Sequence, residues 1–427
     1  GIEIPVLLST FPLPRHRGRR YIARLFMERK REMTFTKRIN ALQPSATMVV
    51  IEAAARLREQ GVDVISFGAG EPDFDTPDHI IAAANKALAD GKTRYTPGSG
   101  TNSLKKAITQ KLKKDNNLDY EPKQIVVSNG GKHSLFNIMM TLFDEGDDVI
   151  ILTPYWVTYP EVVKLSGANP VYVETREENG FQVTRENLSA VISKNSKGII
   201  VNTPSNPSGA VLNRESLQTI VDLANEHDLW IISDECYEAL VYDGEHLSLA
   251  GFEGAYERTI TVQTMSKAFA MTGWRMGYTA STPELASAMG KFQGQATGCP
   301  NSIAQYASEV ALTTEATFLA GWRKQFIERR NYMVSTLDSM SGISCLLPEG
   351  AFYVFPKISG LFGKKAGAFE IKNDLDLTKY LLDVAHITVV PGSAFGAAEH
   401  VRLSYATSMD AIKTGLGRFA DAVAKLN

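Results

Sequence analysis

Five short apolar runs, separated by stretches with helical patterning, limit the fold of this chain more than any other feature of its sequence. Runs rich in Val and Ile that alternate with helices are typical of buried, mostly parallel strands in an α/β domain. We therefore expect a mostly parallel sheet between helices, with ligand-binding loops at the carboxyl ends of the strands. The runs span residues 124–127, 148–152, 198–201, 229–232 and 259–262.

Helical spacing is clearest at the two ends of the chain. Apolar residues recur at this spacing from 48 to 59, and Gly61 follows as a candidate C-cap. Residues 318–340 have the pattern of a long helix, and residues 409–426 that of a terminal helix. Between these last two helices the strands are short, so this section of the chain favours a second, smaller domain.

A polar segment follows each of the five apolar runs directly. The segments are 128–132, 154–157, 202–209, 233–237 and 266–277. Five such segments at one edge of a sheet favour a single binding site. Taken singly, each has an ordinary structural alternative: a tight turn at Gly130, a core position for Trp156, a loop break at Asn206, a helix cap at Asp234 and a solvated Lys267.

The chemistry of these segments indicates a phosphorylated aromatic aldehyde as the ligand. Lys267, placed between a strand and the apolar residues 268–271, is partly desolvated, which favours the neutral amine that a Schiff base needs. Arg275 can pair with a phosphate through two hydrogen bonds, and the backbone amides of Gly130–Lys132 open a helix that can do the same. Trp156 can stack on a ring. Pyridoxal phosphate (PLP) is the ligand that these groups fit.

These segments closely resemble the cofactor-binding motifs of the class I aminotransferases of fold type I, the aspartate aminotransferase family. Residues 266–277 resemble the cofactor-lysine signature, and the likeness runs from about residue 39 to 425. Motifs of other nucleophile and nucleotide sites, such as Gly-x-Ser-x-Gly and His-Glu-x-x-His, do not occur. The resemblance implies a large domain with a mostly parallel seven-stranded sheet between helices, plus a smaller α+β domain. It also covers residues 70–77, 95–97, 350–353 and 401–407.

The resemblance implies four parts of the chain. Residues 1–32 are a basic extension with eight basic and three acidic residues, which we expect to be a disordered extension or tag remnant before a natural start near Met33. Residues 33–78 and 325–427 build the small domain, and residues 79–324 build the large PLP-binding domain. The remaining 37 basic and 44 acidic residues leave the enzyme itself acidic.

Carried over residue by residue, the resemblance assigns roles around the cofactor. Lys267 forms the Schiff base and then moves the substrate proton, Asp234 pairs with the ring nitrogen, and Tyr237 with Asn206 binds the ring oxygen. Trp156 stacks on the ring. The implied cofactor contacts are Tyr95 (from the neighbouring subunit of a homodimer), Gly130, Gly131, Lys132, Trp156, Asn206, Asp234, Tyr237, Thr264, Ser266, Lys267 and Arg275.

The substrate is implied by a second set of residues. Arg402 binds the α-carboxylate, for which the alternative is a surface arginine on a strand. Lys132 reads the distal acid, as in the branch of the family often called Iβ. We therefore expect transfer of an amino group from L-aspartate to 2-oxoglutarate by a ping-pong mechanism. The implied substrate contacts are Thr47, Gly70, Lys132, Trp156, Asn206, Phe352 and Arg402.

Three alternatives stay open. An aromatic or prephenate aminotransferase, or an enzyme that also uses aspartate, is the main competitor, and a PLP-dependent β-lyase shares the first steps. The fold also occurs as the effector domain of transcription regulators, although 32 residues before the core are too few for their DNA-binding part. A purely structural or binding protein is disfavoured because the whole catalytic set is present.

Composition excludes several other classes of protein. With 44% apolar and 22% charged residues, extended disorder is not expected. A net charge of -2 gives no reason to expect nucleic acid as a partner, and no apolar run approaches the roughly 18 to 20 residues that span a bilayer. Cys236, Cys299 and Cys345 are far apart, so neither disulfides nor a metal site is expected, and a cytoplasmic location fits best.

Overall fold

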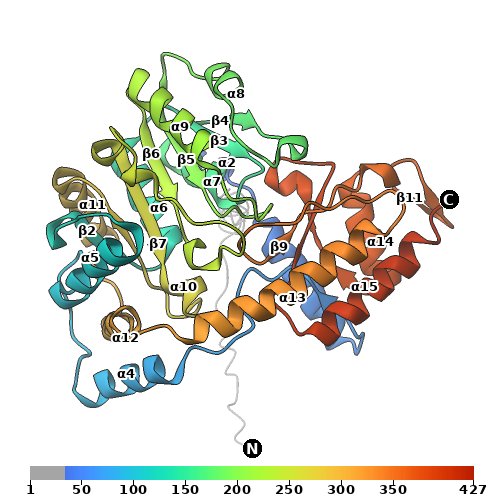
Figure 1. Ribbon diagram of the computed structural model, residues 1–427, viewed down its shortest axis with the longest axis horizontal. Helices are drawn as coiled ribbons and strands as arrows, with labels where there is room; N and C mark the ends of the chain where they lie inside the picture. The colour runs from blue at the N-terminus through green and yellow to red at the C-terminus, as the bar shows by residue number, and fades with distance from the viewer. Residues whose placement is uncertain (1–33) are drawn as a thin grey trace, which may run out of the picture. The chain divides into compact units, whose positions relative to one another are not determined.

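The predicted sheet is present and has seven strands. The computed structural model describes residues 34–427, and the predicted extension at 1–32 lies outside the described residues. The strands are β2 (Ile125–Ser128), β3 (Asp148–Thr153), β4 (Asn169–Glu174), β5 (Ser196–Asn202), β6 (Trp230–Asp234), β7 (Thr259–Thr264) and β8 (Gly277–Ala280). Their order across the sheet is β2-β8-β7-β6-β5-β3-β4 (Figure 1).

The five predicted strands are confirmed, and two further strands join them. The neighbours from β7 through β4 are parallel, whereas β8 runs antiparallel to both β2 and β7. β4 lies at an edge of the sheet and contains Pro170. Proline has no backbone N–H to donate to a neighbouring strand, so it is tolerated at an edge strand but not in a central one. The antiparallel β8 follows the 266–277 signature directly.

Alternate residues of each central strand face opposite sides of the sheet, as the two-residue period of a strand requires. In β5, Ile200 packs with α6 (Gly131–Leu142), α7 (Thr158–Ser166) and α11 (Pro283–Ala296). Its neighbours Ile199 and Val201 pack on the other side with α9 (Arg214–Glu226). Helices therefore bury both faces of the sheet, and functional side chains are left to the loops at its carboxyl edge.

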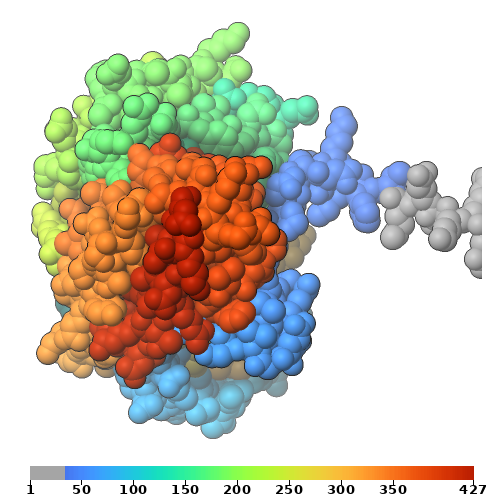
Figure 2. Space-filling view, turned by 90° about the vertical axis from the view of Figure 1, so that its right-hand side faces the viewer, coloured from blue at the N-terminus to red at the C-terminus, as the bar shows by residue number. Residues whose placement is uncertain are grey.

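A second core lies around a smaller antiparallel sheet in the order β13-β14-β9. Its strands are β13 (Val390–Pro391), β14 (Val401–Ser404) and β9 (Tyr353–Val354). They pack with α13 (Phe318–Asp338), α14 (Asp374–Ala385) and α15 (Met409–Val423), and Figure 2 shows α15, in red, on the surface over the orange segments that precede it. The predicted helices at 318–340 and 409–426 are confirmed.

Segments from the two ends of the unit 41–427 pair with one another. β1 (Ile65–Ser66) pairs in parallel with β12 (Ile387–Thr388), and α3 (Ala46–Glu59) contains the predicted helix at 48–59. Gly61, just beyond α3, has a φ of 81°, which suits a glycine at a helix end. Residues 41–427 form one compact unit, and α13 runs unbroken across position 324. The domain boundaries therefore stay a prediction.

The remaining elements complete the described part of the chain. No helix among residues 34–427 is long and apolar enough to cross a membrane. The additional elements are α2 (Lys37–Ala41), α4 (Asp78–Ala89), α5 (Asn102–Asn116), α8 (Arg185–Ser189), α10 (Met265–Ala268), α12 (Ser302–Thr313), β10 (Lys365–Ala366) and β11 (Phe369–Glu370).

Candidate active site

A cavity of about 530 Å³ lies at the carboxyl ends of the central strands. It brings together most of the residues that the sequence singled out, although they come from segments up to 355 positions apart in the chain. The predicted site residues that line it are Thr47, Gly70, Gly131, Lys132, Trp156, Asn206, Asp234, Tyr237, Thr264, Ser266, Lys267, Arg275 and Arg402.

Lys267 reaches the cavity from α10, the short helix that follows β7. Its Nζ donates a hydrogen bond to the carbonyl oxygen of Gly70. The same atom lies 5.7 Å from the ring centroids of both Tyr237 and Phe352. Burial lowers the pKa of Lys267, because the low-polarity surroundings penalise the ammonium form. The site therefore favours a neutral, nucleophilic amine.

Asp234 ends β6 and is 4% exposed. One oxygen accepts a hydrogen bond from the Tyr159 hydroxyl at 2.7 Å, and the other accepts from the Cys236 N–H at 3.3 Å. Among residues 34–427, no basic side chain lies within ion-pair distance of this carboxylate. Burial raises the pKa of Asp234, so the pocket holds an acceptor that a cationic ligand would stabilise.

Arg402 lies on β14 and is 1% exposed. Its Nη1 donates to Asn206 Oδ1 at 3.0 Å, and its Nη2 donates to the Gly68 carbonyl at 2.8 Å. Its Nε is buried and has no hydrogen-bond partner within the described part of the chain. The guanidinium lies over the ring of Tyr353 at 4.5 Å and pairs with no carboxylate of residues 34–427. A ligand carboxylate would satisfy it.

A third group of donors surrounds the beginning of α6. The N-cap Gly130 has a φ of 88°, and a Cβ at this position would lie 2.6 Å from Arg275 Nη2. Glycine thus leaves room for the guanidinium, whose Nη1 donates to the Thr272 carbonyl at 2.6 Å. The hydroxyls of Thr264 and Ser266 are 2.9 Å apart nearby. First-turn amides, hydroxyls and an arginine form a typical phosphate cradle.

The wall of the cavity also includes Lys132 and residues of α3. The Lys132 Nζ lies 5.2 Å from the ring centroid of Trp156. Burial, with a smaller contribution from Arg275, lowers the pKa of Lys132. Thr47 and Met48 line the same wall from α3. Lys132 therefore adds a further basic side chain to a cavity that also holds Arg275 and Arg402.

Three predicted site residues lie outside the lining of the cavity. Tyr95 is 95% exposed, Gly130 borders the cavity through Arg275, and Phe352 is buried in the second core. The adjacent Tyr353 does line the cavity, and its hydroxyl lies 2.8 Å from the hydroxyl of Tyr237.

Sequence reasoning did not assign several residues that line the cavity. Among them are Tyr159, Tyr353 and Glu71. Tyr159 falls one helical turn beyond Trp156, a spacing that could have indicated it, and Tyr353 lies in the 350–353 motif. Glu71 lies in the 70–77 motif and accepts a hydrogen bond from Thr272 at 2.8 Å.

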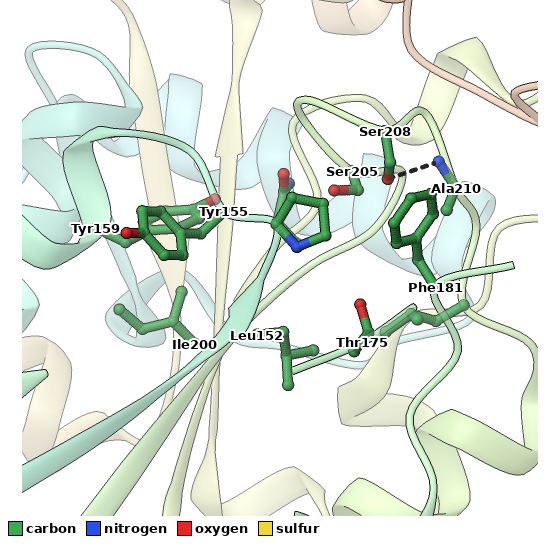
Figure 3. Close-up of a pocket in the computed structure, with 12 residues that line it drawn as sticks. Leu152, Tyr155, Tyr159, Thr175, Phe181, Ile200, Ser205, Ser208 and Ala210 are labelled. Atoms are coloured by element: carbon green, nitrogen blue, oxygen red, sulfur yellow. Dashed lines mark hydrogen bonds between the residues drawn. The ribbon is translucent and has the colours of Figure 1, made fainter. Parts of the chain in front are cut away.

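A smaller cavity of about 30 Å³ lies behind the site (Figure 3). Tyr159 and Asn202 line both cavities, and Ser208 accepts a hydrogen bond from the Ala210 N–H at 3.2 Å beside the small one. Its volume suits one or two water molecules, not a substrate. Tyr159 is thus held between the site and a small, partly polar space.

Three comparisons with known proteins agree on one family. The family described as "Aminotransferase class I and II" matches residues 62–419. The aspartate aminotransferase of Bacillus subtilis is 42% identical over 92% of this chain and 100% of its own length, and the aspartate/prephenate aminotransferase of Cereibacter sphaeroides is 45% identical over 88% and 95%. A solved aspartate aminotransferase of Thermus thermophilus with maleate has a TM-score of 0.87 at 42% identity, covering 91% of this chain and all of that one.

Proposed function

The chain belongs to the class I and II aminotransferases, and on that premise we propose that it transfers an amino group from L-aspartate to 2-oxoglutarate, giving oxaloacetate and L-glutamate. One observation carries the proposal: the cavity holds a buried arginine, Arg402, whose charge meets no carboxylate of the described chain. Relatives named aspartate aminotransferase support the choice of substrate.

The residues of the cavity fit PLP as the cofactor. Asp234, a carboxylate without a cationic partner among residues 34–427, suits a protonated pyridine nitrogen. The space beside Gly130, which a Cβ would fill, suits a phosphate between Arg275 and the first amides of α6. Lys267 offers an amine whose pKa is lowered. The cofactor would be held by Gly131, Lys132, Trp156, Asn206, Asp234, Tyr237, Thr264, Ser266, Lys267 and Arg275.

When bound, PLP supplies an aldehyde that carries the amino group and a ring that accepts electrons. The protein supplies position and proton transfer. Arg402 holds the substrate α-carboxylate, and Lys267 Nζ takes the proton from the substrate Cα. The Asn206 Oδ1 is engaged by Arg402, which leaves the Asn206 amide N–H groups to donate into the cavity beside the Tyr237 hydroxyl.

Tyr353 connects these parts. Its hydroxyl bonds that of Tyr237 at 2.8 Å, and its ring lies against the Arg402 guanidinium. Burial raises the pKa of Tyr237 well above its usual value, so this hydroxyl stays protonated and available as a donor. The two tyrosines therefore hold the substrate arginine and the cofactor side of the pocket in one arrangement.

We assign the distal carboxylate of the substrate to Lys132. Its ammonium lies in the same cavity as Arg402, so a dicarboxylate can meet one cation at each end. The Thermus thermophilus neighbour with maleate, also a dicarboxylate, supports this assignment. Thr47 also lines the cavity, and its hydroxyl can donate a hydrogen bond to a substrate carboxylate.

Prephenate is a second candidate as amino acceptor. The relatives from Cereibacter sphaeroides and Thermus thermophilus are named aspartate/prephenate aminotransferases. The wall formed by Thr47, Met48 and Ile51 offers both a hydroxyl and apolar surface to a larger acid. One enzyme can serve both acids because each carries two carboxylates.

We further propose a cytoplasmic homodimer in which Tyr95 completes the neighbouring subunit's phosphate site. The 95% exposure of this tyrosine supports the proposal, because its ring is free to contact a second subunit. Phe352 would act through Tyr237 and Tyr353, whose rings it contacts. A small domain of 33–78 and 325–427 and a large domain of 79–324 remain our proposed division.

The function is tested with purified enzyme and PLP. Rates are measured for aspartate, glutamate, phenylalanine, tyrosine and kynurenine against 2-oxoglutarate, with prephenate as a further acceptor. We expect aspartate and glutamate to give the highest kcat/KM. Turnover of aromatic donors alone would replace the aspartate assignment, and release of free ammonia with pyruvate, in place of the oxo acid that corresponds to the donor, would indicate a lyase.

The Lys132 assignment is tested by Lys132→Ala. Loss of a charge-assisted bond should raise KM for aspartate by about 10- to 100-fold while KM for phenylalanine changes little. Lys164→Ala, at an ion pair outside the cavity, is the control. An equal change for both substrates would show that Lys132 does not bind the distal acid.

A further inference from the structure

A second pocket, of about 490 Å³, lies apart from the active site and shares none of its lining residues. It opens between α5, the beginning of β2 and one side of α11. No acidic residue lines it. The lining consists of Gly98, Ser99, Lys105, Lys123, Ile125, Pro283, Ala286, Ser287 and Gly290.

Lys105 is the unusual residue of this pocket. It is 8% exposed, although lysine is among the residues least often buried. Its Nζ donates one hydrogen bond, to the Ser99 hydroxyl at 2.5 Å. Within residues 34–427 its ammonium meets no other acceptor and no carboxylate at ion-pair distance. Two of its three N–H groups therefore lack a protein partner.

Burying such a charge is costly unless an opposite charge accompanies it. Burial lowers the pKa of Lys105, and no acidic group offsets that effect. By contrast Lys111, on the same helix, is paired with Glu238. Lys123, at the mouth of the pocket, pairs with Glu121 at 2.9 Å but is largely exposed. The pocket thus carries positive charge that the described chain does not balance.

We propose that this pocket binds a small oxyanion, a phosphate or a carboxylate, with Lys105 as its principal ligand and Lys123 at its entrance. The Ser99 hydroxyl accepts from Lys105, so its own proton is free to donate to the same anion. Ser287, across the pocket on α11, offers a second hydroxyl. Two cations and two hydroxyls are the ligand types that oxyanions prefer.

The site adjoins the segment that carries Tyr95. The Gly98 carbonyl accepts a hydrogen bond from Gln293 Nε2, and the Ser99 carbonyl accepts from the Val127 N–H at 3.0 Å. An anion held by Lys105 and Ser99 would therefore fix the end of this loop against β2 and α11. The expected consequence is a gain in stability of the holoenzyme, because the ligand binds the folded chain alone.

The test uses holoenzyme saturated with PLP, so that phosphate cannot enter the cofactor site. Tm is measured against rising phosphate, with sodium chloride at equal ionic strength as the reference. Wild type should gain Tm with phosphate beyond the chloride effect, and Lys105→Gln should lose most of that gain, with at least a tenfold weaker apparent affinity. Absence of a specific effect in wild type, both with phosphate and with succinate tested in the same way, would overturn the proposal, whatever the variant does.

A matched control and a second anion sharpen the result. Lys106→Gln removes an exposed lysine next in the chain and should keep the full gain, while Lys105→Arg should retain most of it. Succinate in place of phosphate distinguishes a carboxylate site from a phosphate site by which anion shows the Lys105-dependent shift. Equal loss in Lys105→Gln and Lys106→Gln would mean that the anion acts through general charge, and the site would be rejected.

Discussion

Two neighbouring residues, Asp234 and Glu235, belong to two polar regions of opposite character. Asp234 faces the active-site cavity and has no cationic partner in the described chain. Glu235 faces away from it, is fully buried, and accepts hydrogen bonds from Ser233 at 2.8 Å and Ser248 at 2.7 Å. It also contacts His246 Nε2 at 3.0 Å.

Both acids of the second region have protein partners. Glu238 forms an ion pair with Lys111 and accepts a hydrogen bond from Asn116 at 2.7 Å. Glu235, Glu238 and His246 have ligand atoms within 4.8 Å of one another, a spacing that could hold a metal ion. Each carboxylate already has its protein partners, so we expect the cluster to hold the fold together without a metal ion.

The presence or absence of a protein partner distinguishes a ligand site from a structural network. In the cavity, Lys267, Asp234 and Arg402 are buried or partly buried groups whose charges the described chain leaves unmatched. In the network, every acid faces a donor. Burial alone therefore does not indicate function, whereas burial without a partner does.

The largest expected effect comes from Lys267→Ala. Removing the amine should lower kcat by about 10⁴-fold or more, because neither the covalent link nor the proton transfer remains. The absorption band of the enzyme-linked cofactor should disappear as well. Lys291→Ala, at an exposed lysine of α11, should behave as wild type. Wild-type turnover in Lys267→Ala would remove the cavity from consideration as the active site.

A change in the network should act on stability instead. Glu238→Gln leaves the largely buried Lys111 ammonium without a counter-ion and should destabilise the fold by about 3 kcal/mol. At low temperature kcat should stay near the wild-type value. Glu226→Gln, at the exposed Arg185 pair, should cost little by the same thermal measurement. A loss of kcat without a fall in Tm would mean that the network takes part in catalysis.

His246 should give the smallest effect on stability, and the direction in which that effect changes with pH is defined. Burial lowers its pKa, but Glu235 and Glu238 together raise it above the usual value. The stability that protonated His246 contributes is full below its unfolded pKa of about 6.5 and is lost as pH rises through the higher folded pKa. Tm of His246→Gln should therefore fall below wild type most in acid and least in alkali. The opposite trend would contradict the assigned pairing.

Most of the sheet could be predicted from the sequence, since its central strands are buried on both faces and read as continuous apolar runs. β4 and β8 could not, for physical reasons. β4 is an edge strand interrupted by Pro170 and partly exposed, and β8 is four residues long and begins at Gly277 inside the signature. Neither has the length or the pattern that marks a buried strand.

The site was predictable wherever a motif supplied the residue, and less so where packing decides. Phe352 and Tyr353 are adjacent. Because successive side chains at a strand point to opposite sides, a shift of one position decides whether a side chain lies in the core or in the cavity. The sequence also could not show that Glu235 is paired while Asp234 is not, because two partners of Glu235, Ser248 and His246, lie 13 and 11 positions away in the chain and meet it only after folding. Pairing is a property of the folded chain.

The comparison between Asp234 and Glu235 is tested most directly by the rise in Tm when PLP is added to the apoenzyme. Wild type and Glu235→Gln should gain the same number of degrees, because Glu235 meets only protein partners. Asp234→Asn should gain far less, because it cannot balance a protonated ring nitrogen. A full gain in Asp234→Asn, or a gain lost equally in both variants, would contradict the claim that the unpaired carboxylate is the one that binds the cofactor.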